Sequence, residues 1–309
     1  GMRYMAYTEV SSNDADELLI QAGLSGLNKI EPLDGGWANS NYILTLEDGS
    51  KVVLKVWDER PPEEIDLVLQ NTLWLAKHGM PTPVPLTFND GSNLVLKNGA
   101  AWMLMPYVEG DWLSSDYDSL VALGKIQAQL HEIPSPDKIR SSLSMGFVLW
   151  KKMFNLAEQQ NLNSEFIDLL KMEMDTLQGG LFDSLPQGII HGDLFPDNVL
   201  ESNGEISAVL DFEEVCTGPK AFDLVMSFVG FGWENGDPIE ERWTALLQGY
   251  ESIRPLSNNE KMALCDLHRY ATLSIAAWRY WKFVMLMPPS KNTNRYLEMV
   301  ERLDKIPPF

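Results

Sequence analysis

The feature that most constrains the fold is a predicted β-hairpin whose two ends carry polar side chains. Its turn is Asn203-Gly204, a pair that favours a two-residue hairpin between NVLES and EISAVLDF. The motif HGDLFPDN, at residues 191–198, runs into the first strand, and VLDF closes the second. Because side chains alternate along a strand, folding at this turn places Asp211 diagonally across from Asn198 on one face. Diagonal neighbours lie about 7–8 Å apart, so both side chains are expected to bind one hard cation.

A third oxygen-bearing side chain, Asp193, lies just upstream, near enough to meet a substrate hydroxyl. One carboxylate that acts as a base and two oxygen ligands for a metal are what metal-assisted phosphoryl transfer requires. A single Asp or Asn more often caps a loop. The joint spacing, with the apolar segment IIHGD before it, favours the catalytic interpretation. We therefore predict Asp193 as the catalytic residue and Asn198 and Asp211 as the ligands of Mg²⁺.

Composition narrows the class of partner. The chain of 309 residues is 45% hydrophobic and 22% charged, as expected for a globular protein with a substantial core. A formal net charge of −20 argues against nucleic acid or an anionic membrane as a partner. It fits a cationic or zwitterionic small-molecule substrate. Nothing in the sequence indicates an obligatory protein partner.

Cysteine content and hydropathy favour a cytoplasmic protein. Cys216 and Cys265 are too few for a disulfide framework or a cysteine metal cluster. The N-terminus lacks a basic-then-apolar signal segment. The longest apolar stretch, residues 270–287, contains Arg279 and Lys282, so a buried helix is expected there rather than a membrane span.

The order of predicted elements indicates two lobes. The first third is rich in strands, which are expected at 42–46, 52–57, 93–96 and 101–105, with helices at 13–24 and from Pro61-Pro62 to His78. Later helices are expected at 119–131, 143–159 and 164–177, with several more after Ala221. We predict an α+β fold with an N-terminal nucleotide-binding lobe at 2–106, a linker at 107–112 and a helical lobe at 113–309. A cleft between lobes is a favoured place for a ligand.

Lys55 is a candidate for binding phosphate. It lies in VVLKVW, where a cation among apolar side chains needs either a route to solvent or an anion. A lysine on an edge strand that reaches solvent is the alternative. Beside a metal-binding set, contact with the α- and β-phosphates is favoured. Glu63 or Glu64 in the next helix would orient the lysine, although acids are common in any first helical turn.

Two loops are candidates for other contacts with the nucleotide. Gly36 and Asn39 lie in DGGWANSN, where exposed backbone N–H groups would face a phosphate; a plain turn is equally consistent. The segment MLMPYVEG is expected to contact adenine, because Pro106 offers a carbonyl and Val108 an N–H two residues later. A strand end followed by a turn is the alternative.

Candidate contacts with the acceptor follow from charge. Glu213 and Glu214 come directly after the metal-binding segment and would meet a substrate ammonium, unless they form a solvated turn. Arg269 and Arg279 lie ten residues apart in an apolar helical region, where a buried arginine needs an anion. That anion is a substrate carboxylate or an internal acid such as Asp266.

Aromatic residues offer a further contact with the acceptor. Trp233, Trp278 and Trp281 would form a cation–π wall for a quaternary ammonium. At this spacing, packing in the core is the favoured alternative.

Several of these motifs resemble the aminoglycoside/choline/homoserine kinase group, whose fold is similar to that of protein kinases. The resemblance covers nearly the whole chain and includes LGKIQAQLH at 123–131, HGDLFPDN and LDFEEVCTGPKAFDL. HGDLFPDNVL and GYESIRPLS most resemble type II homoserine kinases, whereas DFEE with AFDL equally resembles choline and ethanolamine kinases.

The resemblance implies roles for single residues. Asp193 matches the catalytic aspartate, Asn198 and Asp211 match magnesium ligands, and Lys55 matches the phosphate-binding lysine. Pro106 and Val108 fall where the hinge contacts adenine. Asp223 matches an aspartate that supports the catalytic loop, and His191 is expected to pack and hydrogen-bond. The lysine's usual glutamate partner aligns near Val68, so Glu63 or Glu64 must replace it, or no pair forms.

The resulting hypothesis is an ATP- and Mg²⁺-dependent kinase that phosphorylates a hydroxyl of a small amino-containing metabolite. Homoserine or a related hydroxy amino acid is favoured, because it would use both the acids and the arginines. Choline, ethanolamine and aminoglycosides are the alternative acceptors. A nucleotide-binding pseudokinase, a metal-dependent hydrolase and a protein kinase are the other classes considered. The intact Asp193, Asn198 and Asp211 weigh against a pseudokinase.

Overall fold

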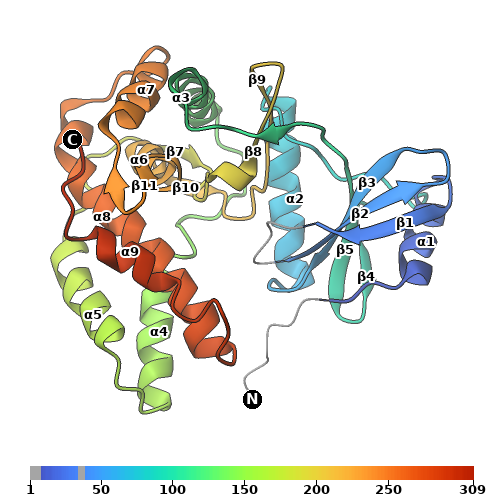
Figure 1. The fold of residues 1–309 in the computed structure, drawn as a ribbon, viewed down its shortest axis with the longest axis horizontal. Coiled ribbons are helices and arrows are strands. Elements are labelled where there is room, and N and C mark those ends of the chain that lie inside the picture. The colour runs from blue at the N-terminus through green and yellow to red at the C-terminus, as the bar shows by residue number, and fades with distance from the viewer. Residues whose placement is uncertain (1–7, 34–38) are drawn as a thin grey trace. The chain divides into compact units, whose positions relative to one another are not determined.

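The computed structural model describes residues 8–33 and 39–309 of the chain (Figure 1). The chain divides into two compact units. The N-terminal unit runs through Asp111 and also includes Ser207–Leu210, and the C-terminal unit comprises Trp112–Ile206 and Asp211–Phe309. The chain passes from the first unit to the second between Asp111 and Trp112, and the predicted bounds of the lobes and linker stay a prediction. In the described part of the chain, no helix is both long and apolar enough to cross a membrane.

The N-terminal unit is built on a five-stranded antiparallel sheet with the order β1-β2-β3-β5-β4. A turn at Asp48-Gly49 joins its second and third strands, and Gly49 N–H donates to the Leu46 carbonyl at 2.9 Å. The first strand was not expected from the sequence, because its residues are half-exposed or exposed and show no apolar alternation. The elements are α1 (Ser12–Gln21), β1 (Leu27–Pro32), β2 (Ser40–Leu46), β3 (Lys51–Trp57), α2 (Pro62–Lys77), β4 (Val95–Lys97) and β5 (Ala100–Pro106).

The alternating side chains of β3 pack in two separate hydrophobic clusters. Leu54 and Val56 pack in one cluster with Leu18 of α1. Trp57 packs in the other with Ile65 of α2. Because successive side chains of a strand point to opposite faces, α1 and α2 cover opposite faces of the sheet.

The C-terminal unit is mainly helical. Its helices are α3 (Tyr117–Glu132), α4 (Phe147–Gln159), α5 (Glu165–Leu177), α6 (Lys220–Phe231), α7 (Glu240–Glu251), α8 (Asn258–Tyr280) and α9 (Tyr296–Arg302). Its short strands are β7 (Gln187–Ile190), β8 (Val199–Ser202), β10 (Cys216–Pro219), β11 (Trp233–Glu234) and β12 (Asp237–Pro238). Two further strands, β6 (Asp111–Trp112) and β9 (Glu205–Val209), contain residues of both units. Helix α8 starts with a capping box between Ser257 and Glu260 and continues into a π-helical turn, η2 (Trp281–Leu286).

The hairpin predicted at Asn203-Gly204 is confirmed. Both turn residues have positive φ, 54° and 78°, as a type I′ turn requires. The predicted diagonal placement of Asn198 and Asp211 on this ladder is wrong, because the strands stop short of both residues. Asn198 ends a 3₁₀ turn, η1 (Pro196–Asn198), whose proline lacks the N–H that a ladder needs. Asp211 has φ 57°, a left-handed conformation that ends the extended strand.

Helices α3 and α7 pack with their backbones in direct contact. A Cβ added at Gly249 would lie 1.9 Å from the Val121 carbonyl oxygen, and one added at Gly124 would lie 2.2 Å from the Leu246 carbonyl oxygen. Neither obstacle is a flexible side chain, so the helices must separate to admit a methyl group. Glycine therefore sets the spacing between the two helices.

We expect Gly249→Ala to lower the free energy of unfolding by about 3 kcal/mol, the upper end of the usual cost of overpacking. Urea denaturation monitored by circular dichroism measures this change. Gly179→Ala is the matched control, because nothing lies within 4 Å of its added Cβ. Equal stabilities of the two variants would contradict the packing described for α3 and α7.

Candidate active site

The candidate active site is built on the strand pair β7 and β10. The strands are antiparallel, with Ile190 opposite Cys216. The segment that follows Ile190 and the segment that precedes Cys216 therefore leave the pair at the same end. This pairing brings the HGD sequence close to the acidic residues that follow Asp211.

The backbone of this loop is held by Asp223, which lies fully buried in the first turn of α6. Its carboxylate accepts hydrogen bonds from the His191 N–H at 3.0 Å and the Gly192 N–H at 2.9 Å. Burial alone would raise the pKa of Asp223. Hydrogen bonds from His131 and Gly192, with the imidazoles of His131 and His191 nearby, outweigh burial and lower that pKa. Asp223 is therefore an anion that fixes the loop, and Gly192 meets it with φ 86°.

Asp193 and Asn198 are tied to each other. The Asn198 Nδ2 donates to the Asp193 carbonyl at 2.7 Å, an orientation that leaves Oδ1 as the oxygen for a cation. The Asp193 N–H donates to His191 Nδ1 at 3.1 Å. The buried His191 ring lies 4.8 Å from the ring of Phe212. His191 thus packs and hydrogen-bonds within the loop.

Four other carboxylates lie within electrostatic range of Asp193 at this site. Burial raises the pKa of Asp193 well above its ordinary range, and the charges of four other acids raise it further: Asp211, Glu214, Asp197 and Glu213. Burial also raises the pKa of Asp197. Such a concentration of negative charge favours a bound cation.

The residues suit a Mg²⁺ ion that is also coordinated by phosphate and water, rather than an ion held entirely by protein ligands. Over residues 8–33 and 39–309, no group of three or more His, Cys, Asp or Glu is arranged to hold a metal ion. Mg²⁺ is usually held by one or two carboxylates together with phosphate oxygens and water. The carboxylate of Asp211 and the amide oxygen of Asn198 would be such a small set of protein ligands, which stays a prediction.

Glu213 and Glu214 do not form a solvated turn. Glu213 is buried, and its N–H donates to Asp211 Oδ1 at 3.3 Å. Glu214 accepts a hydrogen bond from the Ser144 hydroxyl and lies 3.7 Å from the Arg140 guanidinium. Glu214 thus contacts Ser144 and Arg140 rather than solvent alone.

Lys55 lies in the N-terminal unit on β3, which is an interior strand between β2 and β5. The alternative of an edge-strand lysine is therefore wrong. Its Nζ lies 4.1 Å from the centroid of the Trp57 ring, on the face that α2 covers.

The acids considered as partners of Lys55 are both exposed. Glu64 forms an ion pair with Arg60 at 3.5 Å. Val68, where the resemblance places the usual partner, is a core residue. A glutamate partner for Lys55 stays a prediction.

The remaining nucleotide candidates also lie in the N-terminal unit. Pro106 ends β5 opposite Val52, and Val108 follows outside any strand. Asn39 is buried, and its Oδ1 accepts a hydrogen bond from the Asp58 N–H at 3.1 Å. Its side chain therefore serves the local structure of the loop. Gly36 lies outside the described residues.

The two candidate arginines of α8 have different environments. Arg269 donates from Nε to Glu173 of α5 at 2.8 Å, so its internal acid is Glu173 rather than Asp266. The side chain of Arg279 is 9% exposed; its Nη1 donates to the Arg295 carbonyl at 3.1 Å and lies 3.6 Å from the Glu298 carboxylate, its internal acid. Burial lowers the pKa of Arg279, whereas the charges of Glu298 and Asp193 raise it. Arg279 therefore lies within electrostatic range of Asp193.

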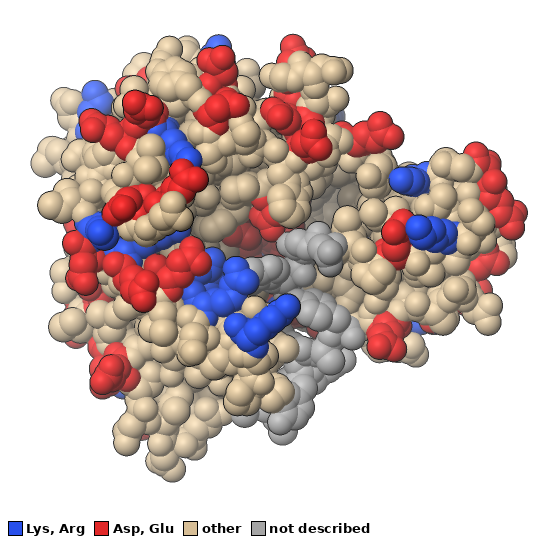
Figure 2. Space-filling view, viewed as in Figure 1, with Lys and Arg blue, Asp and Glu red and all other residues tan. Residues whose placement is uncertain are grey.

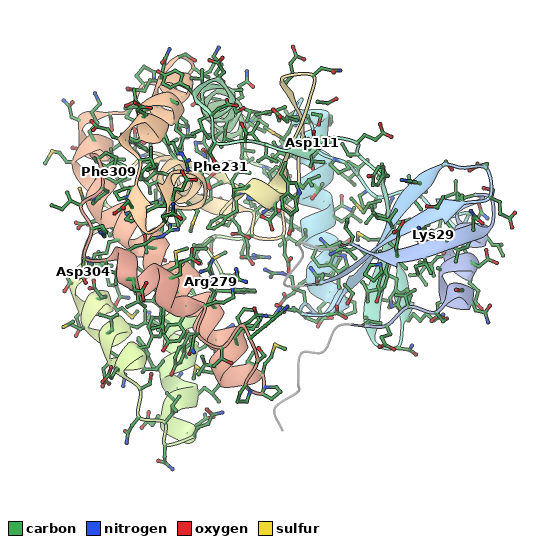
Figure 3. The ribbon with its side chains drawn as sticks, in the orientation of Figure 1. Lys29, Asp111, Phe231, Arg279, Asp304 and Phe309 are labelled. Carbon is green, nitrogen blue, oxygen red and sulfur yellow. The ribbon has the colours of Figure 1, made fainter. Side chains whose placement is uncertain are left out.

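Positive charge gathers around Arg279. Arg295 lowers the pKa of Arg279, and Arg279 in turn lowers that of Arg302, so the three arginines interact with one another. Arg279, labelled in Figure 3, belongs to α8, and Arg302 belongs to α9, which packs beside α8 (Figure 1). Figure 2 shows basic side chains collected at this position on a face where acidic side chains predominate elsewhere.

Trp233 packs in the core, which is the alternative to a cation–π wall that its spacing favours. Its Nε1 donates to His268 Nε2 at 3.3 Å, the two rings are stacked, and the Arg302 guanidinium lies 4.8 Å from its ring. The His268 ring is also 5.4 Å from that of Phe309, which Figure 3 labels. Burial, with the charge of Arg302, lowers the pKa of His268 to about 3.

Sequence reasoning missed two residues of this site. Asp197 belongs to the acidic cluster, but the motif alone assigns it no role. His131 donates to Asp223, but a histidine at the end of an apolar helical pattern is usually a core residue, so the sequence does not single it out. The signal available was its place as the last residue of LGKIQAQLH.

Comparison with known proteins finds relatives over nearly the whole chain. A model of the phosphotransferase enzyme family matches residues 29–256. A homoserine kinase of Brucella melitensis biotype 2 is 27% identical over 283 residues, which cover 90% of this chain and 86% of that protein.

Solved structures share the fold. A microcompartment-associated aminopropanol kinase has a TM-score of 0.72 at 21% identity, covering 94% of this chain and 95% of its own. A Plasmodium vivax ethanolamine kinase has a TM-score of 0.68 at 15% identity, covering 94% of this chain and 82% of its own. These likenesses confirm the predicted α+β, protein-kinase-like fold class.

The pKa of His268 generates a prediction for stability. An unfolded histidine titrates near 6.5, so between that value and about pH 3 the unfolded chain binds one more proton than the folded chain. Stability must therefore fall as the pH falls through this window, by about 2 kcal/mol at pH 5.

Urea denaturation at pH 7 and pH 5 tests this expectation. Between pH 7 and pH 5 we expect the free energy of unfolding of His268→Gln to fall by about 2 kcal/mol less than that of the wild type. This difference does not depend on the stability of the variant at pH 7. The exposed His78, changed to Gln, is the control and should behave as the wild type. The same pH dependence in all three proteins would show that His268 is not buried in its neutral form.

Proposed function

Because the chain belongs to the phosphotransferase enzyme family and is a small-molecule kinase, we propose that it uses ATP to phosphorylate a small hydroxy amino acid. The proposed acceptor is the hydroxyl of homoserine or of a close relative. The observation that carries the proposal is the loop at Asp193. Asp223 fixes that loop, Asn198 is tied to it, and the carboxylate of Asp211 lies within electrostatic range.

Asp193 is proposed to orient the acceptor hydroxyl and to take its proton as the phosphoryl group transfers. A positioned base of this kind contributes about 10²–10⁴ to the rate. Asn198 and Asp211 would hold Mg²⁺, which when bound neutralises charge on the β- and γ-phosphates. Lys55 is the proposed contact of the α- and β-phosphates, and the Pro106 carbonyl and Val108 N–H are the proposed contacts of adenine.

The choice of acceptor rests on Arg279. This buried cation is within electrostatic range of Asp193 and is accompanied by Arg295 and Arg302, so it favours an acceptor that carries a carboxylate. Glu213 would meet the ammonium group of the same molecule. The homoserine kinase relative agrees with this choice. Choline, ethanolamine and aminopropanol have no carboxylate and would leave Arg279 without a role in binding.

A panel of acceptors tests the proposal. ADP release is measured with Mg²⁺-ATP and homoserine, choline, ethanolamine, hydroxylysine or an aminoglycoside, and the product is identified by ³¹P NMR. We expect homoserine or another hydroxy amino acid to give the highest kcat/KM. Arg279→Gln should raise the KM for that acceptor about 10- to 100-fold, which is the value of one or two charged hydrogen bonds.

Arg269→Gln is the matched control, because its guanidinium pairs with Glu173, and its KM for the acceptor should be that of the wild type. Turnover of choline or ethanolamine without turnover of any hydroxy amino acid would refute the proposed acceptor class.

A further inference from the structure

A chain of buried hydrogen bonds runs from the catalytic loop to the start of α8. Asp223, which holds the loop, also receives His131 Nε2 at 2.8 Å. His131 Nδ1 lies 2.6 Å from the Tyr250 hydroxyl, and Arg254 Nη1 donates to that hydroxyl at 3.2 Å. Arg254 donates twice to the carboxylate of Glu260, at 3.0 and 2.9 Å.

The donors and acceptors of this chain allow one consistent arrangement. Arginine only donates, so the Tyr250 oxygen accepts a hydrogen bond from Arg254. The Tyr250 hydroxyl then donates a hydrogen bond to His131 Nδ1. His131 is then neutral and carries its proton on Nε2, where it donates to Asp223. A doubly protonated His131 would leave the buried hydroxyl hydrogen of Tyr250 without an acceptor here. Arg254 and Tyr250 therefore select the tautomer of His131 that Asp223 needs.

This chain of hydrogen bonds is closed to solvent. The side chains of His131 and Asp223 have no exposed surface, nor does that of Glu260, and Tyr250 is fully buried. Only Arg254 has some exposure, at 13%. Water therefore cannot replace a lost partner at the centre of the chain, and removing one bond leaves a buried polar group unsatisfied.

We propose that Tyr250 and Arg254 are positioning residues for Asp193 and act on it through His131 and Asp223. The proposal rests on the proposed function, because it assigns Asp193 to the reaction. The path is short: Asp223 holds the N–H of Gly192, whose left-handed conformation sets the direction in which the next residue, Asp193, leaves the strand.

The surrounding packing makes the chain of hydrogen bonds stiff. Gly249, next to Tyr250, lies against the backbone of α3 at Val121, and α3 carries His131. The rings of His131 and Tyr250 meet edge to face with centroids 5.4 Å apart. At the far end, Glu260 also caps α8, the helix that carries Arg279. The same interactions thus tie the catalytic loop to the helix proposed to bind the acceptor.

Tyr250→Phe tests the proposal with the smallest change. We expect kcat to fall about tenfold with an unchanged KM for ATP, because one buried hydrogen bond and the tautomer it selects are lost. Tyr280→Phe is the matched control: Tyr280 is also buried, and its hydroxyl bonds Ser164 at 2.6 Å, outside this chain. Its kcat should stay within about twofold of the wild type.

Variants of His131 separate positioning from a general loss of structure. Glutamine can place a donor where Nε2 lies, so His131→Gln should retain more kcat than His131→Leu. Adding Tyr250→Phe to His131→Gln should lower kcat no further, since the hydroxyl then has no imidazole to act through. Full additivity of the two changes would overturn the proposal.

Hydrogen exchange gives a readout that does not depend on turnover. The amides of His191 and Gly192 should exchange faster in Tyr250→Phe than in the wild type or in Tyr280→Phe, because both donate to Asp223. If the wild type phosphorylates no acceptor, the proposed function fails, and this exchange still tests the chain of hydrogen bonds. Unchanged exchange in Tyr250→Phe would refute the positioning role.

Discussion

The interaction on which the candidate active site depends is the set of hydrogen bonds to the Asp223 carboxylate. Two backbone N–H groups of the HGD segment and the imidazole of His131 converge on one buried anion. Removing a fully buried anion from water is costly, and only donors on every side offset that cost. The hydrogen bonds that the Asp223 carboxylate requires therefore set the geometry of the loop, and the loop sets the position of Asp193.

The acidic cluster beside Asp193 explains why the site suits a metal and a polyphosphate. Carboxylates gathered at one place raise one another's pKa, as seen for Asp193, unless positive charge is added. A magnesium ion supplies that charge, and phosphate oxygens complete its coordination. Arg279 adds the opposite sign within electrostatic range of Asp193. An acceptor with both an ammonium and a carboxylate matches this distribution of charge.

The sequence predicted local features well and long-range polar contacts poorly. The turn at Asn203-Gly204 was predictable, because few dipeptides adopt positive φ at both positions. The exact relation of Asn198 to Asp211 was not, since it depends on a 3₁₀ turn and a left-handed aspartate rather than on strand alternation. The partner of Arg269 could not be chosen either. Glu173 lies 96 residues away, and no pattern distinguishes it from Asp266.

The central claim is that Asp193 acts on the acceptor while other residues hold the nucleotide. Measuring both kcat and the dissociation constant of Mg²⁺-ATP for Asp193→Asn tests it most directly. The substitution keeps the size of the side chain and its backbone bonds, so we expect nucleotide affinity within about twofold of the wild type and a kcat lower by about 10² or more. Near-normal kcat in this variant would remove Asp193 from the mechanism and contradict the account.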